Sequence, residues 1–482
     1  MRWVAAWTGT QGEQVIRRTK IVCTIGPSSA SPTVLRSLLK AGMDVARLNF
    51  SHGDHATHRQ AAIDVRAAAE DAGLPVALLG DLQGPKIRTG SLESAFQRLV
   101  RGRRVFLTGG RREGENEIEV SHPELVDALH GGDRVLIDDG RIELVVRACS
   151  ARRAECSVVR GGLLGERKGV SVPGRPLPMP ALTEKDLQDL ELAVELGVDF
   201  VALSFVRHPE DVLACQRRLA DLGCRAQVIA KLEKLEAIRN LSKILEVADA
   251  VMVARGDLGV ELKLGELPAV QKDVIDRANR AGVPVITATE MLESMVTATR
   301  PTRAEASDVA NAIWDGTDAV MLSQETSVGA HPVEAVRAMA RICLSAQQHP
   351  AFQRQRQIWR EPGEIGSAIA HAAATSADEL GARVIIAFTE SGTTALRCSK
   401  ARPRVPVIAA SPHPDVLRRT ALYSGVIPML VDSGGDTDQM VANATQAAVR
   451  SGLVRPGDRV VVVAGVPIGQ PGQTNLMKVE VV

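Results

Sequence analysis

The chain has 482 residues, more than one hydrophobic core usually holds, so its length favours about three domains. Its composition, 45% hydrophobic and 24% charged, is typical of a globular protein. A formal net charge of +1 and an aromatic content of 2% argue against a nucleic-acid partner.

The N-terminal residues 1–17 are predicted to form a loose tail with no signal sequence, and no stretch of the chain predicts a membrane span. Seven scattered cysteines without a Cys-x-x-Cys spacing argue against a disulfide framework or a zinc site. We therefore expect a reducing, cytoplasmic location.

Short apolar runs rich in β-branched residues alternate with amphipathic helical stretches from residue 18 onward. Eight runs predict strands: 20–25, 45–50, 75–79, 200–205, 228–232, 250–254, 283–287 and 319–322. Strands that are apolar throughout and separated by helices indicate a parallel sheet covered on both faces. The fold class is therefore α/β, with a (β/α)8 TIM barrel predicted over residues 18–89 and 177–346.

Two further domains are predicted. The helical pattern stops over residues 90–176, where short alternating runs such as 134–137 predict a small inserted β-barrel. A polar linker follows the barrel over 347–362, and strand–helix alternation then resumes. Residues 361–482 are therefore predicted to form a C-terminal α/β domain.

Polar side chains follow seven of the eight predicted barrel strands, where barrel enzymes place their chemistry. They are Arg47, Asn49, Ser51, Asp81, Ser204, Lys231, Glu233, Arg255, Asp257, Thr289, Ser323 and Glu325. A single serine or threonine at such a place is better explained as a helix cap. Capping does not require so many charges at one rim, so the set predicts a catalytic site.

Two of these segments have a specific chemical interpretation. Lys231 and Glu233 are two residues apart at a strand end, so both side chains face the same side. Glu233 and Asp257 offer the hard oxygen ligands that Mg²⁺ (or Mn²⁺) prefers, and Gly256 lets backbone N–H groups approach an anion. A surface Lys–Glu pair and a plain Gly-Asp turn are the alternatives.

Eight segments, in order along the chain, resemble the pyruvate kinase family. They are RTKIVCTIGPSS (18–29), MDVARLNFSHG (43–53), GPKIRTG (84–90), IAKLE (229–233), MVARGDLG (252–259), ATEMLESM (288–295), PTRAE (301–305) and DGTDAVMLSQE (315–325). The resemblance implies Mg²⁺-dependent phosphoryl transfer from phosphoenolpyruvate to ADP, giving pyruvate and ATP in the final step of glycolysis. It also implies the barrel, the inserted domain, the C-terminal domain and a cytoplasmic homotetramer.

The resemblance also implies roles for the catalytic residues. Glu233 and Asp257 would bind Mg²⁺, Lys231 would stabilise the transition state, and Arg47 would contact the transferring phosphate. A positioned ammonium suits this reaction because negative charge develops on the moving group and on the departing enolate oxygen.

Substrate and nucleotide contacts follow from the same resemblance. The backbone N–H groups of Gly256 and Asp257, with Thr289, would hold the carboxylate of phosphoenolpyruvate, and Thr289 would lie near the protonation of the enolate. The implied nucleotide contacts are Asn49, His52, Arg88 and Lys168. Because Lys168 is at the edge of the insert, we expect the insert to close over ADP as a lid.

One segment departs from the pattern of family members that need K⁺. Those members hold K⁺ near the positions of Asn49, Ser51 and Asp81 and resemble D-T-K-G-P-E, whereas this chain reads D-L-Q-G-P-K. Leu82 removes a hydroxyl, and Lys86 replaces a carboxylate by an ammonium that would repel a bound cation. We hypothesise that K⁺ is not required. The alternative is that Lys86 pairs with Asp81 while K⁺ still binds.

The C-terminal domain carries a phosphate-binding pattern directly after a predicted strand, at the start of a helix. Its residues are Thr389, Ser391, Gly392, Thr393 and Thr394. The family binds phosphorylated allosteric effectors in this region, but the loop 465–474 has neither tryptophan nor arginine, which disfavours fructose bisphosphate. AMP or a sugar monophosphate is the alternative effector, and a plain helix cap explains the residues equally well.

Two other functions are compatible with parts of the pattern. A Mg²⁺-dependent lyase or aldolase acting through a pyruvate enolate would use the same paired carboxylates, but it does not explain Lys231 or a basic lid. A metabolite-sensing protein without catalysis would be expected to have lost Lys231, Glu233, Asp257 or Thr289, and all four are present.

Overall fold

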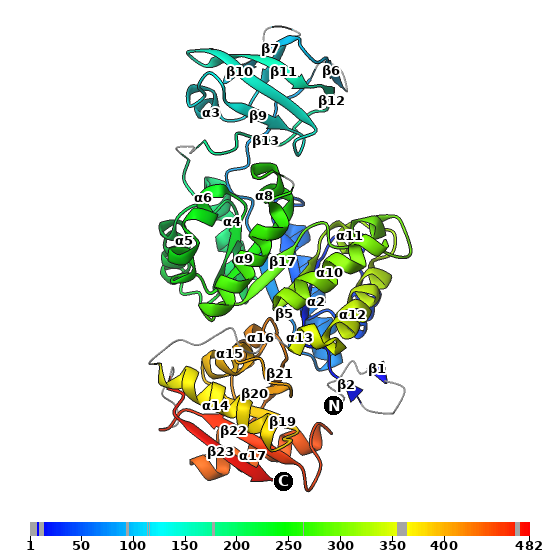
Figure 1. Ribbon diagram of the computed structural model, residues 1–482, viewed down its shortest axis with the longest axis vertical. Coiled ribbons are helices and arrows are strands. Elements are labelled where there is room, and N and C mark those ends of the chain that lie inside the picture. Colours follow the sequence, from blue (N-terminus) through cyan, green and yellow to red (C-terminus); the bar gives the residue numbers. More distant parts are fainter. Residues whose placement is uncertain are drawn as a thin grey trace.

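The computed structural model describes residues 7–8, 14–92, 96–112, 114, 116–175, 179–263, 265–353, 364–467 and 473–482. Three parts follow one another along its long axis: the inserted β-domain, the barrel and the C-terminal domain (Figure 1). Within the predicted tail, β1 (Trp7–Thr8) pairs with β2 (Gln14–Val15). Within the predicted linker, residues 354–362 lie outside the described part.

Eight parallel strands close the barrel in the order β14-β15-β16-β17-β18-β3-β4-β5. They are β3 (Lys20–Thr24), β4 (Val45–Asn49), β5 (Ala77–Asp81), β14 (Phe200–Leu203), β15 (Gln227–Leu232), β16 (Ala250–Ala254), β17 (Val285–Ala288) and β18 (Ala319–Leu322). The predicted (β/α)8 barrel is thereby confirmed. β5 and β17 begin two residues later than predicted, after Pro75 and Pro284, which have no N–H to donate to a ladder.

Helices cover the outside of the barrel (Figure 1). They are α1 (Pro32–Ala41), α2 (His55–Ala72), α4 (Glu184–Glu195), α5 (Pro209–Asp221), α6 (Leu235–Arg239), α7 (Leu241–Leu245), α8 (Arg255–Glu261), α9 (Leu267–Arg280), α10 (Arg303–Asp315), α11 (Gln324–Ser327), α12 (Pro332–Gln348) and α13 (Pro350–Gln353), with a short 3-10 helix η1 (Glu293–Val296). The side chains of Ser31, Asp54, Thr183 and Thr302 accept backbone N–H groups at helix starts, which fixes where four helices begin.

The inserted domain contains a six-stranded sheet in the order β13-β9-β10-β11-β7-β8 and a strand pair β12-β6. Its elements are β6 (Gln97–Leu99), β7 (Arg104–Thr108), β8 (Glu117–Glu119), α3 (Pro123–Asp127), β9 (Arg134–Ile137), β10 (Ile142–Ser150), β11 (Arg153–Arg160), β12 (Gly162–Leu164) and β13 (Val170–Ser171). Among the described residues, strand pairing does not close the sheet into the predicted barrel. Residues 88–89 run between the two edges of this sheet and make one isolated bridge to each: Arg88 with Gly169, and Thr89 with Val120. Two single bridges do not make a strand that would close the sheet.

The C-terminal domain is a five-stranded sheet in the order β21-β20-β19-β22-β23. Its elements are α14 (Ile365–Glu379), β19 (Val384–Phe388), α15 (Thr393–Lys400), β20 (Val407–Ser411), α16 (Pro414–Thr420), β21 (Val426–Leu430), α17 (Thr437–Arg450), β22 (Arg459–Ala464) and the antiparallel β23 (Leu476–Val481). A buried ion pair joins it to the barrel, since Lys400 Nζ lies 2.7 Å from Asp318 Oδ2. No described helix has the length and apolar character needed to span a bilayer.

Candidate active site

A network of buried charges occupies the carboxyl ends of the barrel strands β4, β5 and β15, with β14 between the last two. Arg47, on β4, places Nε 2.6 Å from Asp81 Oδ2 at the end of β5. Lys231, on β15, places Nζ 3.3 Å from Asp81 Oδ1 and 2.9 Å from Glu233 Oε1. The structure therefore brings together four residues that the sequence pattern assigned to one rim.

Lys231 is held in place from several directions. Its ammonium donates to Ser204 Oγ at 2.7 Å, and that hydroxyl donates to the Leu82 carbonyl at 2.7 Å. Burial alone lowers the pKa of Lys231, but the carboxylates of Asp81 and Glu233 outweigh it, so the pKa lies above its ordinary value. Lys231 therefore stays charged at neutral pH and can act as a fixed positive charge, not as a base.

Glu233 and Asp257 fit a divalent cation. Glu233 is buried, and its second oxygen accepts the Phe205 N–H at 2.7 Å. Burial raises the pKa of Glu233, and the neighbouring charge of Asp257 raises it further, against the lowering by Lys231. A cation between these carboxylates would relieve their repulsion. Mg²⁺ usually takes only one or two carboxylates, and Glu233 and Asp257 are the two that would hold it.

Gly256 and Thr289 contact each other at the mouth of the barrel. The Gly256 N–H donates to Thr289 Oγ1 at 2.8 Å. Thr289 and Glu290 both have left-handed backbones, with φ of 66° and 53°. The Arg255 guanidinium donates to both of their carbonyls, at 2.7 Å and 3.1 Å, and pairs with Asp308 at 2.6 Å. This left-handed pair could not be predicted from the sequence, because neither residue is glycine.

The predicted monovalent-cation region is divided in the structure. Asn49 lies opposite Asp81 in register, and its side chain accepts the Ser51 N–H at 3.2 Å. Lys86 points elsewhere: its Nζ lies 3.6 Å from Asp257 Oδ1. The alternative of an ion pair between Lys86 and Asp81 is therefore wrong, because the turn after β5 carries the ammonium towards α8.

The predicted nucleotide contacts lie at the junction between the barrel and the inserted domain. Burial lowers the pKa of His52, and the cations of Arg88, Lys86 and Arg47 lower it further, so His52 lies in a positive field. Arg88 donates to the Arg167 carbonyl at 3.1 Å. Lys168 pairs instead within the inserted domain, with Nζ 2.9 Å from Asp138 Oδ1.

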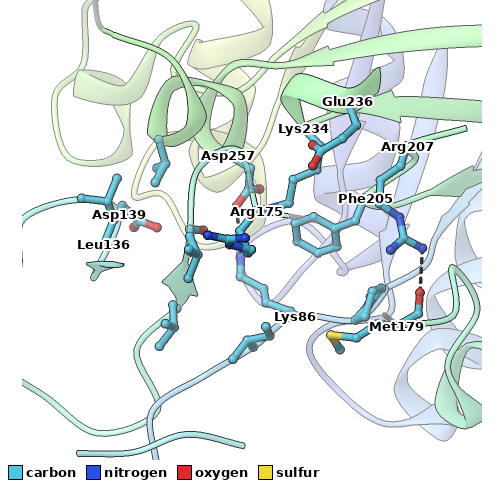
Figure 2. A pocket seen from close by; sticks show the side chains of 17 residues that line it. Lys86, Leu136, Asp139, Arg175, Met179, Phe205, Arg207, Lys234, Glu236 and Asp257 are labelled. Atoms are coloured by element: carbon cyan, nitrogen blue, oxygen red, sulfur yellow. Dashed lines mark hydrogen bonds and ion pairs between the residues drawn. The ribbon is translucent and has the colours of Figure 1, made fainter. Parts of the chain in front are cut away.

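A pocket between the barrel and the inserted domain adjoins this network (Figure 2). Barrel residues Lys86, Phe205, Lys234 and Asp257 line one side, and Asp139 belongs to the inserted domain. Phe205 has a left-handed backbone with φ of 55°, and the Glu233 carboxylate holds its N–H. Phe205 and Lys234 were missed by the sequence analysis because neither residue has a motif of its own.

Glu325, a predicted rim residue, bonds to the backbone of α11 and its surroundings and not to the charged network. The Glu325 carboxylate is buried and accepts the Leu292 N–H at 3.0 Å and the Ser323 N–H at 2.7 Å. Glu325 thus holds backbone around α11, and its role in the structure is to satisfy buried N–H groups.

The predicted effector segment opens α15 after β19, as expected. Its hydroxyls bond within the protein: Thr389 Oγ1 accepts the Gly392 N–H at 2.8 Å, and Ser391 bonds Thr393 at 2.9 Å. Thr394 bonds Thr474 at 3.0 Å. Part of the facing loop, residues 468–472, lies outside the described part.

The fold and the charged rim define a (β/α)8-barrel enzyme with one inserted and one C-terminal domain. Residues 16–336 match a family model described as pyruvate kinase, barrel domain, and residues 367–480 match one described as pyruvate kinase, alpha/beta domain. The chain belongs to the pyruvate kinase family.

Similar proteins cover nearly the whole chain. It is 47% identical to the pyruvate kinase of Geobacillus stearothermophilus over 97% of this chain and 80% of that protein. It is 47% identical to pyruvate kinase 2 of Synechocystis over 97% of this chain and 79% of that protein. It is 45% identical to the pyruvate kinase of Mycobacterium tuberculosis over 96% of this chain and 98% of that protein.

Proposed function

We propose that the protein catalyses Mg²⁺-dependent phosphoryl transfer from phosphoenolpyruvate to ADP, giving pyruvate and ATP, as the final step of glycolysis in the cytoplasm. The observation that carries this proposal is the position of the Lys231 ammonium, 2.9 Å from Glu233 and 3.3 Å from Asp81. Membership of the pyruvate kinase family supports it.

Lys231 and Arg47 neutralise the charge that moves in the reaction. As the bond to the enolate oxygen breaks, negative charge spreads over the phosphoryl group and that oxygen. A preorganised ammonium and guanidinium stabilise this charge without having to reorient. Glu233 and Asp257 would hold Mg²⁺ or Mn²⁺, which supplies further positive charge at the same place when bound.

Gly256 and Thr289 orient the substrate. The carboxylate of phosphoenolpyruvate would accept the N–H groups of Gly256 and Asp257 and the Thr289 hydroxyl, in place of the present 2.8 Å bond between Gly256 and Thr289. The enolate is protonated in the second half-reaction, and Thr289 would take part in that step through a water molecule.

Asn49, His52, Arg88 and Lys168 are the proposed nucleotide contacts. The positive field at His52 suits the phosphates of ADP. Lys168 would exchange Asp138 for a phosphate when the inserted domain closes and excludes water. These residues support a nucleotide as second substrate and do not suit a lyase or aldolase.

Three further properties are proposed. K⁺ is not required, because Lys86 replaces a carboxylate of the K⁺-requiring pattern by a positive charge. The segment 389–394 takes a phosphorylated effector such as AMP or a sugar monophosphate. The enzyme forms a homotetramer, as is usual in the family.

A coupled assay tests the reaction. With phosphoenolpyruvate, ADP and Mg²⁺, pyruvate and ATP should appear in equal amounts, and EDTA should stop both until Mg²⁺ is restored. Pyruvate and inorganic phosphate without ATP would instead show that the phosphoryl group is transferred to water and not to ADP.

A further inference from the structure

A second cavity, of about 850 Å³, lies between the barrel and the C-terminal domain, beside residues 74–76, at the end of β5 opposite to Asp81. Its barrel side consists of α2 and residues 74–76, and its other side consists of α16, the end of β21 and α17. A cavity of this size at a domain junction falls in the usual range for small-molecule sites, roughly 300–1,000 Å³.

The larger part of the cavity wall is apolar. Leu74 comes from the barrel side, while Leu417, Met429 and Leu430 come from the C-terminal domain. Leu430 ends β21 and is 57% exposed, although the other four residues of that strand are buried. The wall can therefore cover the apolar body of a ligand from two sides.

The charged residues of this wall carry one positive charge in excess. Arg66 and Arg418 both line the cavity, and each lies 2.8 Å from a carboxylate oxygen of Asp199, which is buried behind the lining. Arg450 and Glu70 also line it, and the structure records no side-chain ion pair or hydrogen bond for Arg450 among the described residues. Counted with Asp199 and Glu70, the three guanidinium groups leave one positive charge uncompensated among the described residues.

We propose that this cavity binds an amphiphilic organic monoanion, with its acid group beside Arg418 and Arg450 and its apolar body against Leu74, Leu417 and Leu430. The apolar wall favours burial of a hydrophobic body. The single excess positive charge favours a ligand with one negative group. A neutral ligand would leave that positive charge without a partner, and a dianion would bring a second negative charge that has none. The inference does not depend on the proposed reaction.

The place of the cavity gives such a ligand contact with both domains. Residues 74–76 lead directly into β5, and β5 ends at Asp81, which holds Arg47 and Lys231. A ligand bound here would therefore touch the C-terminal domain and the segment before a strand of the candidate active site.

Two fluorescent probes that share one ring system test the proposal: 8-anilinonaphthalene-1-sulfonate, a monoanion, and the neutral N-phenyl-1-naphthylamine. Titration of the full-length protein with the sulfonate should show saturable binding at least tenfold tighter than that of the neutral probe. Arg450→Glu and Leu430→Glu should each weaken sulfonate binding at least tenfold, because the first reverses the uncompensated charge and the second places a carboxylate in the apolar wall.

Matched controls separate this site from general charge or surface effects. Arg455→Glu and Leu380→Glu change exposed residues of the same domain that do not line the cavity, and both should bind the sulfonate like the unaltered protein. Arg450 is exposed and has no recorded side-chain partner in the described part of the chain, so Arg450→Glu carries the test if Leu430→Glu fails to fold. Unchanged sulfonate binding by Arg450→Glu, equal binding of the two probes, or no saturable binding would each overturn the proposal.

Discussion

Replacement of Lys231 by methionine keeps an unbranched side chain, one atom shorter, and removes its ammonium. In the structure that ammonium lies 2.9 Å from Glu233, 3.3 Å from Asp81 and 2.7 Å from Ser204, and its side chain is only 12% exposed. Removal of one preorganised charge-stabilising group typically costs on the order of 10²–10³ in kcat, or about 2.7–4 kcal/mol of transition-state stabilisation. We expect a loss of at least this size, measured as ATP formation in a coupled assay.

Metal binding distinguishes a catalytic role from a structural one. The Lys231 ammonium lowers the pKa of Glu233, so the substitution raises that pKa further. Because a metal ion binds the ionised carboxylate, metal binding will then need a higher pH to reach full strength. Above that pH, Mn²⁺ affinity should be retained or increased, because a cation competing for Glu233 has gone. Paramagnetic resonance measures free Mn²⁺ directly.

Lys243→Met is the matched control, since Lys243 is exposed on α7 and lies outside the site. It should leave turnover and Mn²⁺ affinity unchanged. Turnover of Lys231→Met within tenfold of the unaltered enzyme would refute the reasoning. Loss of turnover together with Mn²⁺ affinity at high pH would show a structural role instead.

Four further outcomes are expected. The unaltered enzyme should be fully active in buffer free of sodium and potassium. The activity of Lys86→Glu should be at least tenfold lower in that buffer and should partly recover when K⁺ is added; strong K⁺ activation of the unaltered enzyme would contradict this. Gly84→Ala should lower both the thermal unfolding midpoint and turnover, because φ is +65° and the added Cβ would lie 2.9 Å from Ser204 Cβ. Gly73→Ala is the control: its φ is +64° but its added Cβ meets open space, so it should lower only the midpoint. Asp318→Asn should destabilise the protein by roughly 3–5 kcal/mol, because its lysine partner stays buried without a counter-charge; a midpoint shift under about 2 °C would argue against this. AMP or ribose 5-phosphate should shift the phosphoenolpyruvate saturation curve to lower concentration if the effector segment is functional; no shift with either would favour a plain helix cap.

The barrel was predictable because its strands are buried on both faces and therefore apolar throughout. The number and order of the strands followed from that pattern, and the two late starts followed from Pro75 and Pro284. β23 was missed because it is largely exposed and carries alternating charges instead of an apolar run. Local rules thus located elements well wherever burial decided the residue types.

The rim of the site was predictable from the strand ends, but its individual contacts were predictable only where the partners are close in sequence. Lys231 and Glu233 meet because residues two apart on a strand share a face, and the structure places them 2.9 Å apart. The pairing of Lys86 with Asp257 joins residues far apart in the chain, so no local rule selects Asp257 over Asp81. The left-handed backbone of Thr289 depends on Arg255, again through tertiary contacts.

The pairing of Gly256 with Thr289 at 2.8 Å has a consequence for how the enzyme handles its reactants. Both groups are already satisfied at rest, so an incoming carboxylate exchanges one set of hydrogen bonds for another and gains only the difference. Under the proposed function, the same pairing would re-form when pyruvate leaves, so the glycine amide would again have the threonine hydroxyl as its acceptor.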